Sequence, residues 1–203
     1  MGHSKDDKAE SHERIVSVAA ERIRESGTES PGVAEIMRAA GLTHGGFYKH
    51  FTNREELINE AVEHAMRENE TDAAQVVSGA DDPLAAFADW YLSEAHRDDP
   101  AHGCGVAALC TDVPHLGRPA QESYRAQVER YLARLQGLLA SDDPDVRSRA
   151  NVTLSAMVGA VMIARGLGAT DRSDELLRDV LEAIQERRLL PPGRHVDRRR
   201  EPK

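Results

Sequence analysis

The feature that most constrains the fold of this chain is a helical spacing of apolar residues that recurs over almost its whole length. In residues 10–26, for example, Ile15, Ala19 and Ile23 lie four positions apart, so an α-helix would place them on one face. The sequence contains no convincing alternation of apolar and polar residues, which would indicate a half-buried β-strand. Short clusters of Gly, Pro and Asp interrupt the helical pattern. The sequence therefore predicts an all-α fold.

Helix start and stop signals set the expected bounds in the amino-terminal part. Glycine is favoured just after a helix, and Ser, Thr and Asn side chains cap the amino-terminal ends of helices. The signals are Gly27 and Gly41 as C-terminal caps, Thr43 and Asn53 as N-caps, and Ser30 with Pro31 as an N-cap followed by proline at the first helical position. They predict helices over 10–26, from 31 to 40, from 44 to about 51, and over 54–70.

Short polar segments that end in proline divide the remainder of the chain. The breaks fall at Asp81–Pro83, Asp98–Pro100, Arg118–Pro119 and Asp142–Pro144. Between them, helices are expected over 83 to about 96, 106–111, 119–140, 145–167 and 173–190. The polar, Arg-rich residues 191–203 are expected to form a disordered tail.

Residues 33–51 place two short predicted helices on either side of a tight turn at residues 40–43. This is the arrangement of a helix-turn-helix, whose second helix enters the DNA major groove and meets base edges with its first residues. Tight helical corners also occur in other all-α proteins, so the spacing alone leaves a packing role open.

The formal net charge of −9 is unusual for a protein that binds nucleic acid. Residues 1–53 contain seven Lys/Arg and eight Asp/Glu, and residues 54–203 carry a net charge of −8. The helix-turn-helix region is thus nearly neutral and lacks the basic excess typical of nonspecific binders. If this region binds DNA, a few local cations and helix N-termini have to position it.

A more specific signal lies in residues 41–51, Gly-Leu-Thr-His-Gly-Gly-Phe-Tyr-Lys-His-Phe, followed by Asn-Arg-Glu-Glu-Leu at 53–57. Residues 14–58, which contain both motifs, resemble the amino-terminal domain of the TetR family of bacterial transcriptional regulators. The resemblance implies a ligand-responsive repressor with a three-helix DNA-binding domain over 1–53. It also implies a larger helical domain for ligand binding and dimerisation over 54–190, with helix 54–70 connecting the two.

The resemblance further implies a homodimer on a palindromic operator in double-stranded DNA, with half-sites about 34–36 Å apart or a multiple of that distance. Phe47 and Phe51 are expected to pack inside the domain, and packing is also the alternative role for Tyr48 and His50. The expected DNA contacts are Ser30, Gly32, Thr43, His44, Gly45, Gly46, Tyr48, Lys49, His50 and Arg54.

In the larger domain, helices 119–140 and 145–167 are expected to form a four-helix bundle with those of a second copy. The candidates for this interface are Tyr131, Leu135, Ala156, Gly159 and Ala160. A hydrophobic or amphipathic effector is expected, because ligand pockets are mostly apolar with a few polar groups. The candidate pocket residues are Phe87, Trp90, Tyr91, Cys104, Tyr124, Met157 and Met162. For both sets, packing in the core of one chain is the alternative.

Cys104 lies near a predicted helix N-terminus, where the helix dipole would lower the pKa of its thiol. A sensor of electrophiles or oxidants and a small structural residue both remain open for this position. Cys104 and Cys110 cannot form a disulfide framework, and His96, His102 and Cys104 match no standard zinc spacing. The sequence therefore predicts neither a metal nor a cofactor.

The sequence contains no glycine-rich phosphate loop, no His-Glu-x-x-His and no nucleophile elbow, so an enzyme is not expected. An all-α interaction adaptor without DNA binding is the second alternative. The amino terminus lacks the apolar core of a secretory signal, and no stretch approaches the roughly 18 apolar residues of a membrane span. A cytoplasmic protein that does not enter the membrane is expected. The sequence does not reveal the effector, the operator or the sign of regulation.

Overall fold

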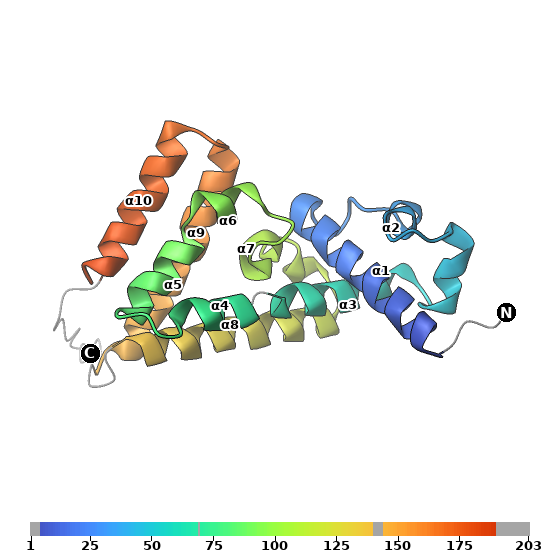
Figure 1. Ribbon diagram of the computed structural model, residues 1–203, viewed down its shortest axis with the longest axis horizontal. Helices are drawn as coiled ribbons and strands as arrows, with labels where there is room; N and C mark the ends of the chain where they lie inside the picture. Colours follow the sequence, from blue (N-terminus) through green and yellow to red (C-terminus); the bar gives the residue numbers. More distant parts are fainter. Residues whose placement is uncertain (1–4, 69, 140–143, 190–203) are drawn as a thin grey trace, which may run out of the picture.

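The computed structural model of the chain describes residues 5–68, 70–139 and 144–189. Within these ranges every regular element is an α-helix or a short 3-10 helix, so the predicted all-α fold is confirmed. The molecule is elongated, with α1 and α2 at one end and α10 at the other (Figure 1). The expected tail at 191–203 lies outside the described residues.

The amino-terminal domain consists of α1 (Lys5–Ser26), α2 (Val33–Ala39) and the 3-10 helix η1 (His44–Lys49). Both predicted glycine caps are confirmed, because Gly27 has φ 79° and Gly41 has φ 73°, a region that glycine enters without a Cβ clash. The core of this domain is made of side chains at most 2% exposed: Ile15, Ile23, Ile36, Met37, Phe47 and Phe51. The burial of each of these side chains stabilises the folded domain by about 1.5–3 kcal/mol, and together they hold the three elements against one another.

The prediction for the start of α2 is wrong. The helix begins at Val33, and its N-cap is Gly32 rather than Ser30. Pro31 is buried but lies before the helix, because its carbonyl accepts a hydrogen bond from the guanidinium of Arg54. This long-range bond holds the preceding segment away from a helical turn.

The third helix of the chain is α3 (Arg54–Arg67), which connects the two domains. Its predicted N-cap is confirmed, since Oδ1 of Asn53 accepts a hydrogen bond of 2.9 Å from the amide of Glu56. The larger domain then contains α4 (Glu70–Val77), α5 (Pro83–Tyr91), α6 (Glu94–Asp98), α7 (Gly105–Leu109), the 3-10 helix η2 (Val113–His115), α8 (Arg118–Leu138), α9 (Val146–Leu167) and α10 (Asp171–Gln185).

Two helices that were predicted as continuous are each divided. The one expected over 83–96 breaks at Ser93, whose hydroxyl accepts from the amide of His96 and donates to the carbonyl of Trp90. The one expected over 54–70 ends at Arg67, and Glu70 opens α4. The carboxylate of Glu70 accepts hydrogen bonds from three side chains of α8, which hold α4 against that helix: Gln127 at 2.9 Å, Arg130 at 3.1 Å and Arg134 at 2.7 Å.

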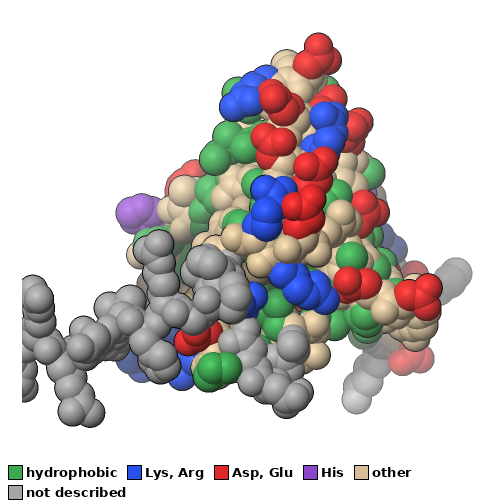
Figure 2. All heavy atoms as spheres, turned by 90° about the vertical axis from the view of Figure 1, so that its left-hand side faces the viewer, with side chains coloured by type: hydrophobic (Ala, Val, Ile, Leu, Met, Phe, Trp, Pro, Cys, Tyr) green, Lys and Arg blue, Asp and Glu red, His purple; other side chains and the backbone are tan. Residues whose placement is uncertain are grey.

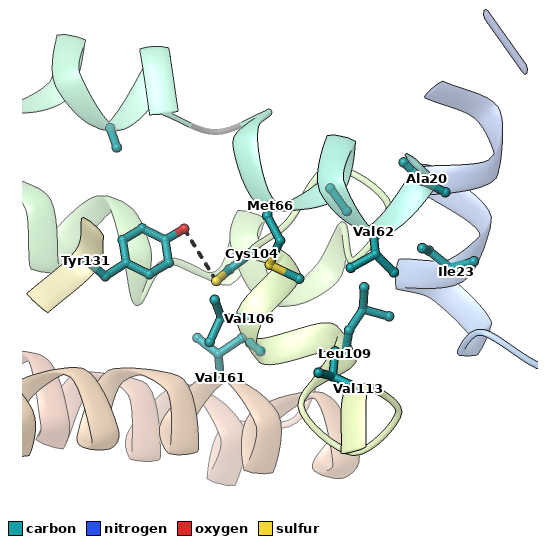
Figure 3. Close-up of a cluster of buried hydrophobic side chains, with 14 of the residues drawn as sticks. Ala20, Ile23, Val62, Met66, Cys104, Val106, Leu109, Val113, Tyr131 and Val161 are labelled. Atoms are coloured by element: carbon teal, nitrogen blue, oxygen red, sulfur yellow. Dashed lines mark hydrogen bonds between the residues drawn. The ribbon is translucent and has the colours of Figure 1, made fainter. Parts of the chain in front are cut away.

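The short helix α7 lies where the two domains meet. Val62 and Met66 of α3 lie beside Val106 of α7 in an apolar cluster (Figure 3). At Gly105 the two backbones come so close that an added Cβ would lie 2.7 Å from the carbonyl oxygen of Ala65. A movement of α7 would therefore displace α3 directly.

Two polar contacts also join the domains. The buried guanidinium of Arg24 in α1 donates to the carbonyl of Ala101 and pairs with Glu68 at 2.5 Å. The amide and hydroxyl of Thr28 donate to one carboxylate oxygen of Asp112, at 2.7 and 2.9 Å. The α1–α2 loop is thus anchored to the larger domain beside α7.

Part of the acidic surplus lies at the end of the molecule farthest from the amino-terminal domain. Figure 2 views that end and shows carboxylates interspersed with basic side chains over its surface. The acidic residues of α10 are Asp171, Asp174, Glu175, Asp179 and Glu182. The net charge of −9 therefore does not describe the surface near η1.

Candidate functional site

The turn between α2 and η1 and the start of η1 are open to solvent. Thr43, the N-cap of η1, is exposed, as are His44 and Gly45. Tyr48 is 75% exposed, the largest exposure among the described large hydrophobic side chains. Its neighbour Phe47 is only 2% exposed and anchors the segment from below. A rigid apolar base thus presents a row of polar groups outward, which is the arrangement that major-groove reading requires.

Tyr48 and His50, for which packing was the alternative, differ in their surroundings. The hydroxyl end of Tyr48 has no role in the core, because three quarters of the residue is exposed. His50 is half-buried, with its ring 6.0 Å from that of His12. Burial, followed by the charges of His12, Lys8 and Lys49, lowers the pKa of His50. Lys49 itself is exposed.

Ser30 and Gly32 are exposed at the amino-terminal end of α2. No side chain caps this end of the helix, and the space beside Gly32 is open. Amide groups at such an end attract anions such as phosphate. The Gly45 position is equally open, whereas a Cβ on Gly46 would contact Met37 at 3.6 Å.

Arg54, expected at a DNA phosphate, has a different environment. Its guanidinium donates to the carbonyls of Thr28, Glu29 and Pro31, at 2.5, 3.4 and 3.3 Å. These bonds close the loop between α1 and α2. Arg54 therefore supports the amino-terminal end of α2 instead of projecting freely toward DNA.

The larger domain contains a buried polar cluster formed by Tyr91, His96, Cys104 and Tyr131. The amide of Cys104 donates to Nε2 of His96 at 2.9 Å, so Nδ1 carries the proton and donates to the carbonyl of Tyr91 at 2.6 Å. Burial lowers the pKa of His96 to about 4, which keeps the imidazole neutral. The ring of His96 also lies edge-to-face with that of Tyr91, at 4.7 Å.

The two tyrosines of this cluster point toward the same sulfur. The thiol of Cys104 lies 3.5 Å from the hydroxyl of Tyr131 (Figure 3). Burial, followed by the neighbouring Cys104 side chain, raises the pKa of Tyr91. The Tyr91 hydroxyl has no hydrogen-bond partner among the described residues. Burial raises the pKa of both phenols well above their ordinary value, so both remain hydrogen-bond donors.

The predicted pocket residues divide into two groups. Phe87, Trp90 and Tyr91 lie together, with ring centroids 6.0 to 6.4 Å apart, and Cys104 joins them at Tyr91. Tyr124 is half-buried, and Met157 is fully buried in the core. Met162 is 36% exposed on α9, and its place in the ligand pocket stays a prediction.

Three of the predicted dimer contacts are buried inside the chain. Tyr131, Leu135 and Ala160 are at most 4% exposed and have no surface left for a partner. Ala156 and Gly159 are half-buried and lie on the outer side of α9. The exposed apolar residues that the sequence analysis missed here are Ile163, 56% exposed, and Leu167, 43% exposed. Gly159, Ile163 and Leu167 follow one another at steps of four positions, and this helical spacing was the signal that could have found them.

Helix α9 has the length and composition of a membrane span, and only 39% of its apolar stretch is buried within the chain. Its Gly and Ala residues and its buried side fit a helix that packs against protein. Among the described residues, no group of three His, Cys, Asp or Glu side chains is placed to hold a metal ion.

This chain is similar to known proteins both in its sequence and in its three-dimensional structure. The family model of bacterial regulatory proteins, tetR family, matches residues 15–61. An uncharacterized HTH-type transcriptional regulator of Mycobacterium tuberculosis is 27% identical over 170 residues, 75% of this chain and 83% of that protein.

Solved structures extend the similarity to the larger domain. A TetR transcriptional regulator from Chloroflexus aurantiacus aligns with a TM-score of 0.77 and 25% identity, over 89% of this chain and 97% of that one. A TetR-family transcriptional regulator from Agrobacterium tumefaciens aligns with a TM-score of 0.74 and 21% identity, over 87% and 98%, and shares the fold. The similarity thus includes the motif around η1 and nearly the whole helical arrangement.

Proposed function

This chain belongs to the TetR family of DNA-binding transcriptional regulators, and we propose that it is a cytoplasmic, homodimeric repressor that a small-molecule effector releases from a palindromic operator. Proteins of this family regulate transcription and are not enzymes. The observation that carries the DNA-binding part is the exposed row of Thr43, His44 and Tyr48 above the buried Phe47.

The outer face of α9 supports the homodimer. Ile163 and Leu167 are apolar and exposed, and the small residues Ala156 and Gly159 precede them on the same side. A second copy of α9 packed on this face would remove these side chains from water. A two-fold pair also carries two reading heads, as a palindromic operator requires.

The buried cluster around Cys104 supports the effector site. It combines the aromatic surface of Phe87 and Trp90 with the Tyr91 hydroxyl, a buried donor without a partner. Such a donor costs about 1–3 kcal/mol and would be satisfied by an acceptor oxygen on an amphipathic ligand. The cluster lies close to α7, since Cys104 is the N-cap of that helix.

Release then requires the effector to favour a geometry that does not bind DNA. α7 is in contact with α3 at Gly105 and Ala65, and Arg24 and Thr28 link the amino-terminal domain to the segments on either side of α7. A ligand that displaces α7 would move α3 and change the separation of the two heads. Because half-sites repeat at the helical pitch, a displacement of a few ångströms is enough to weaken binding.

Gel-shift assays with the purified protein and the region upstream of its own gene test DNA binding. Light scattering coupled to size exclusion tests the dimer, and Ile163→Glu should give a monomer that no longer shifts the DNA. Arg178→Glu on the exposed face of α10 is the control and should leave both properties unchanged. A wild-type dimer that shifts no DNA at low salt would refute the repressor proposal.

A thermal-shift screen of amphipathic molecules that carry an acceptor oxygen tests the effector site. A true effector should raise Tm and dissociate the protein–DNA complex, and Tyr91→Phe should weaken both effects. A compound that stabilises the protein and leaves the complex intact is not the proposed effector.

A further inference from the structure

A groove separates the first turns of α1 from the helix-turn-helix. Its wall on the α1 side is formed by Asp7, Lys8 and Ser11. Its opposite wall comes from the end of α2, the turn and η1: Met37, Gly41, Leu42, Thr43, Gly46, Lys49 and His50. Side chains that lie between 26 and 43 positions apart in the sequence therefore face the same groove.

Positive charge gathers at this groove although the chain as a whole is acidic. The chain contains only four lysines, at positions 5, 8, 49 and 203. Lys8 and Lys49 line the groove from opposite walls. Both groove lysines are exposed, and neither has an ion-pair partner among the described residues.

The pKa of His50 reflects the same positive charges. After burial, the charges of His12, Lys8 and Lys49 are the causes that lower the pKa of His50. One nitrogen of the His50 ring, Nδ1, is buried without a hydrogen-bond partner in the described part of the chain. Asp7 is the single carboxylate among the groove-lining residues, so the cations outnumber it.

The position of the groove matches the width of DNA. The exposed amino-terminal end of α2 lies before Val33, whereas the groove is lined by Met37 in the last turn of that helix and by Gly41 just after it. Seven residues of α-helix span about 10 Å. The major groove is about 12 Å wide, so an element inserted in it has a phosphate backbone on each side.

We propose that this groove is a second phosphate-binding site of the DNA-binding domain, in which Lys8 of α1 joins Lys49 and His50 to hold the DNA backbone on the side of η1 away from the start of α2. The site deepens the proposed function and rests on it. It extends the DNA interface to the first turns of α1, outside the helix-turn-helix. It also supplies local cations that the near-neutral domain needs.

The salt dependence of DNA binding tests this site. Each phosphate contact contributes about 0.9 to the slope of log affinity against log salt, so a dimer with Lys8→Ala should lose about 1.8. Between about 50 and about 200 mM NaCl, wild-type protein should therefore lose roughly tenfold more affinity than Lys8→Ala. Lys8→Arg should keep the wild-type slope, and Arg178→Ala on α10 should leave it unchanged.

The binding measurements use the upstream duplex and an unrelated duplex of equal length, because a backbone contact is independent of sequence. Amine-reactive labelling with mass spectrometry gives an independent readout, in which DNA should protect Lys8 and Lys49 and leave Lys203 reactive. Equal slopes for wild type and Lys8→Ala, or a Lys8 that stays reactive on DNA, overturn the site while the wild-type gel shift still supports the regulator. A wild-type protein that binds neither duplex overturns both proposals.

Discussion

Acid should unfold this protein through His96 in a pH range that the geometry defines. The ring accepts a hydrogen bond from the Cys104 amide at Nε2 and donates one to the Tyr91 carbonyl from Nδ1. Protonation of Nε2 would place two donors face to face. Burial holds the pKa at about 4, against an ordinary value of 6.5.

The sign and size of the effect follow from linkage. Between pH 6.5 and pH 4 the unfolded chain binds a proton at His96 and the folded chain does not, so stability rises with pH in this range. One pH unit corresponds to about 1.4 kcal/mol, and the full interval to about 3 kcal/mol. This contribution is complete above pH 6.5 and is lost as the pH falls toward 4. At this chain length the loss lowers Tm by about 6–12 °C.

The assay is urea denaturation followed by circular dichroism from pH 7.5 to pH 4 at one protein concentration. Carboxylates titrate in the lower part of this range, so the informative quantity is the difference between wild type and His96→Gln. Glutamine keeps an acceptor for the Cys104 amide and does not titrate, and its stability curve should therefore be flatter by about 3 kcal/mol. The exposed His115→Gln is the matched control and should follow wild type. Parallel curves for wild type and His96→Gln would refute the reasoning.

Three further substitutions test contacts at α7, at the loop between α1 and α2, and in the buried polar cluster around Cys104. Gly105→Ala should cost about 1–3 kcal/mol in urea denaturation, because its Cβ would meet the carbonyl of Ala65 at 2.7 Å, and an unchanged midpoint would contradict this close approach. Arg54→Ala should destabilise the protein by about 1–3 kcal/mol by leaving loop carbonyls without their donor, and a variant that loses only DNA affinity would instead support a phosphate contact. Tyr91→Phe should retain or raise Tm, since it removes a buried hydroxyl without a partner, and a clear loss of stability would show that this hydroxyl is bonded in solution.

The candidate DNA-binding site could be located from sequence because its residues are contiguous. The motif at 41–51 includes the turn, the exposed Thr43 and Tyr48 and the buried Phe47 within one short segment. Local spacing is enough to order such residues along a helix. The sequence did not indicate a role for Lys8, because only the packing of α1 across the domain brings this residue opposite Lys49.

The sequence by itself determined the all-α class, the glycine and asparagine caps and the position of the helix-turn-helix. These features depend on backbone preferences and on a period of about 3.6 residues, which act over a few neighbouring positions. Only the tertiary structure decided which face of each helix is covered. It buried Tyr131 and Leu135 in the chain and left Ile163 and Leu167 exposed.

Tertiary contacts likewise decided where helices are interrupted and which role each buried or half-buried arginine has. Arg54 closes a loop that ends more than twenty positions earlier, and the arginines of α8 hold Glu70 across some sixty positions. A periodic pattern specifies that a residue lies on one face of a helix, but the partner of that face is set by packing between distant segments. The role of each polar side chain here follows from that partner.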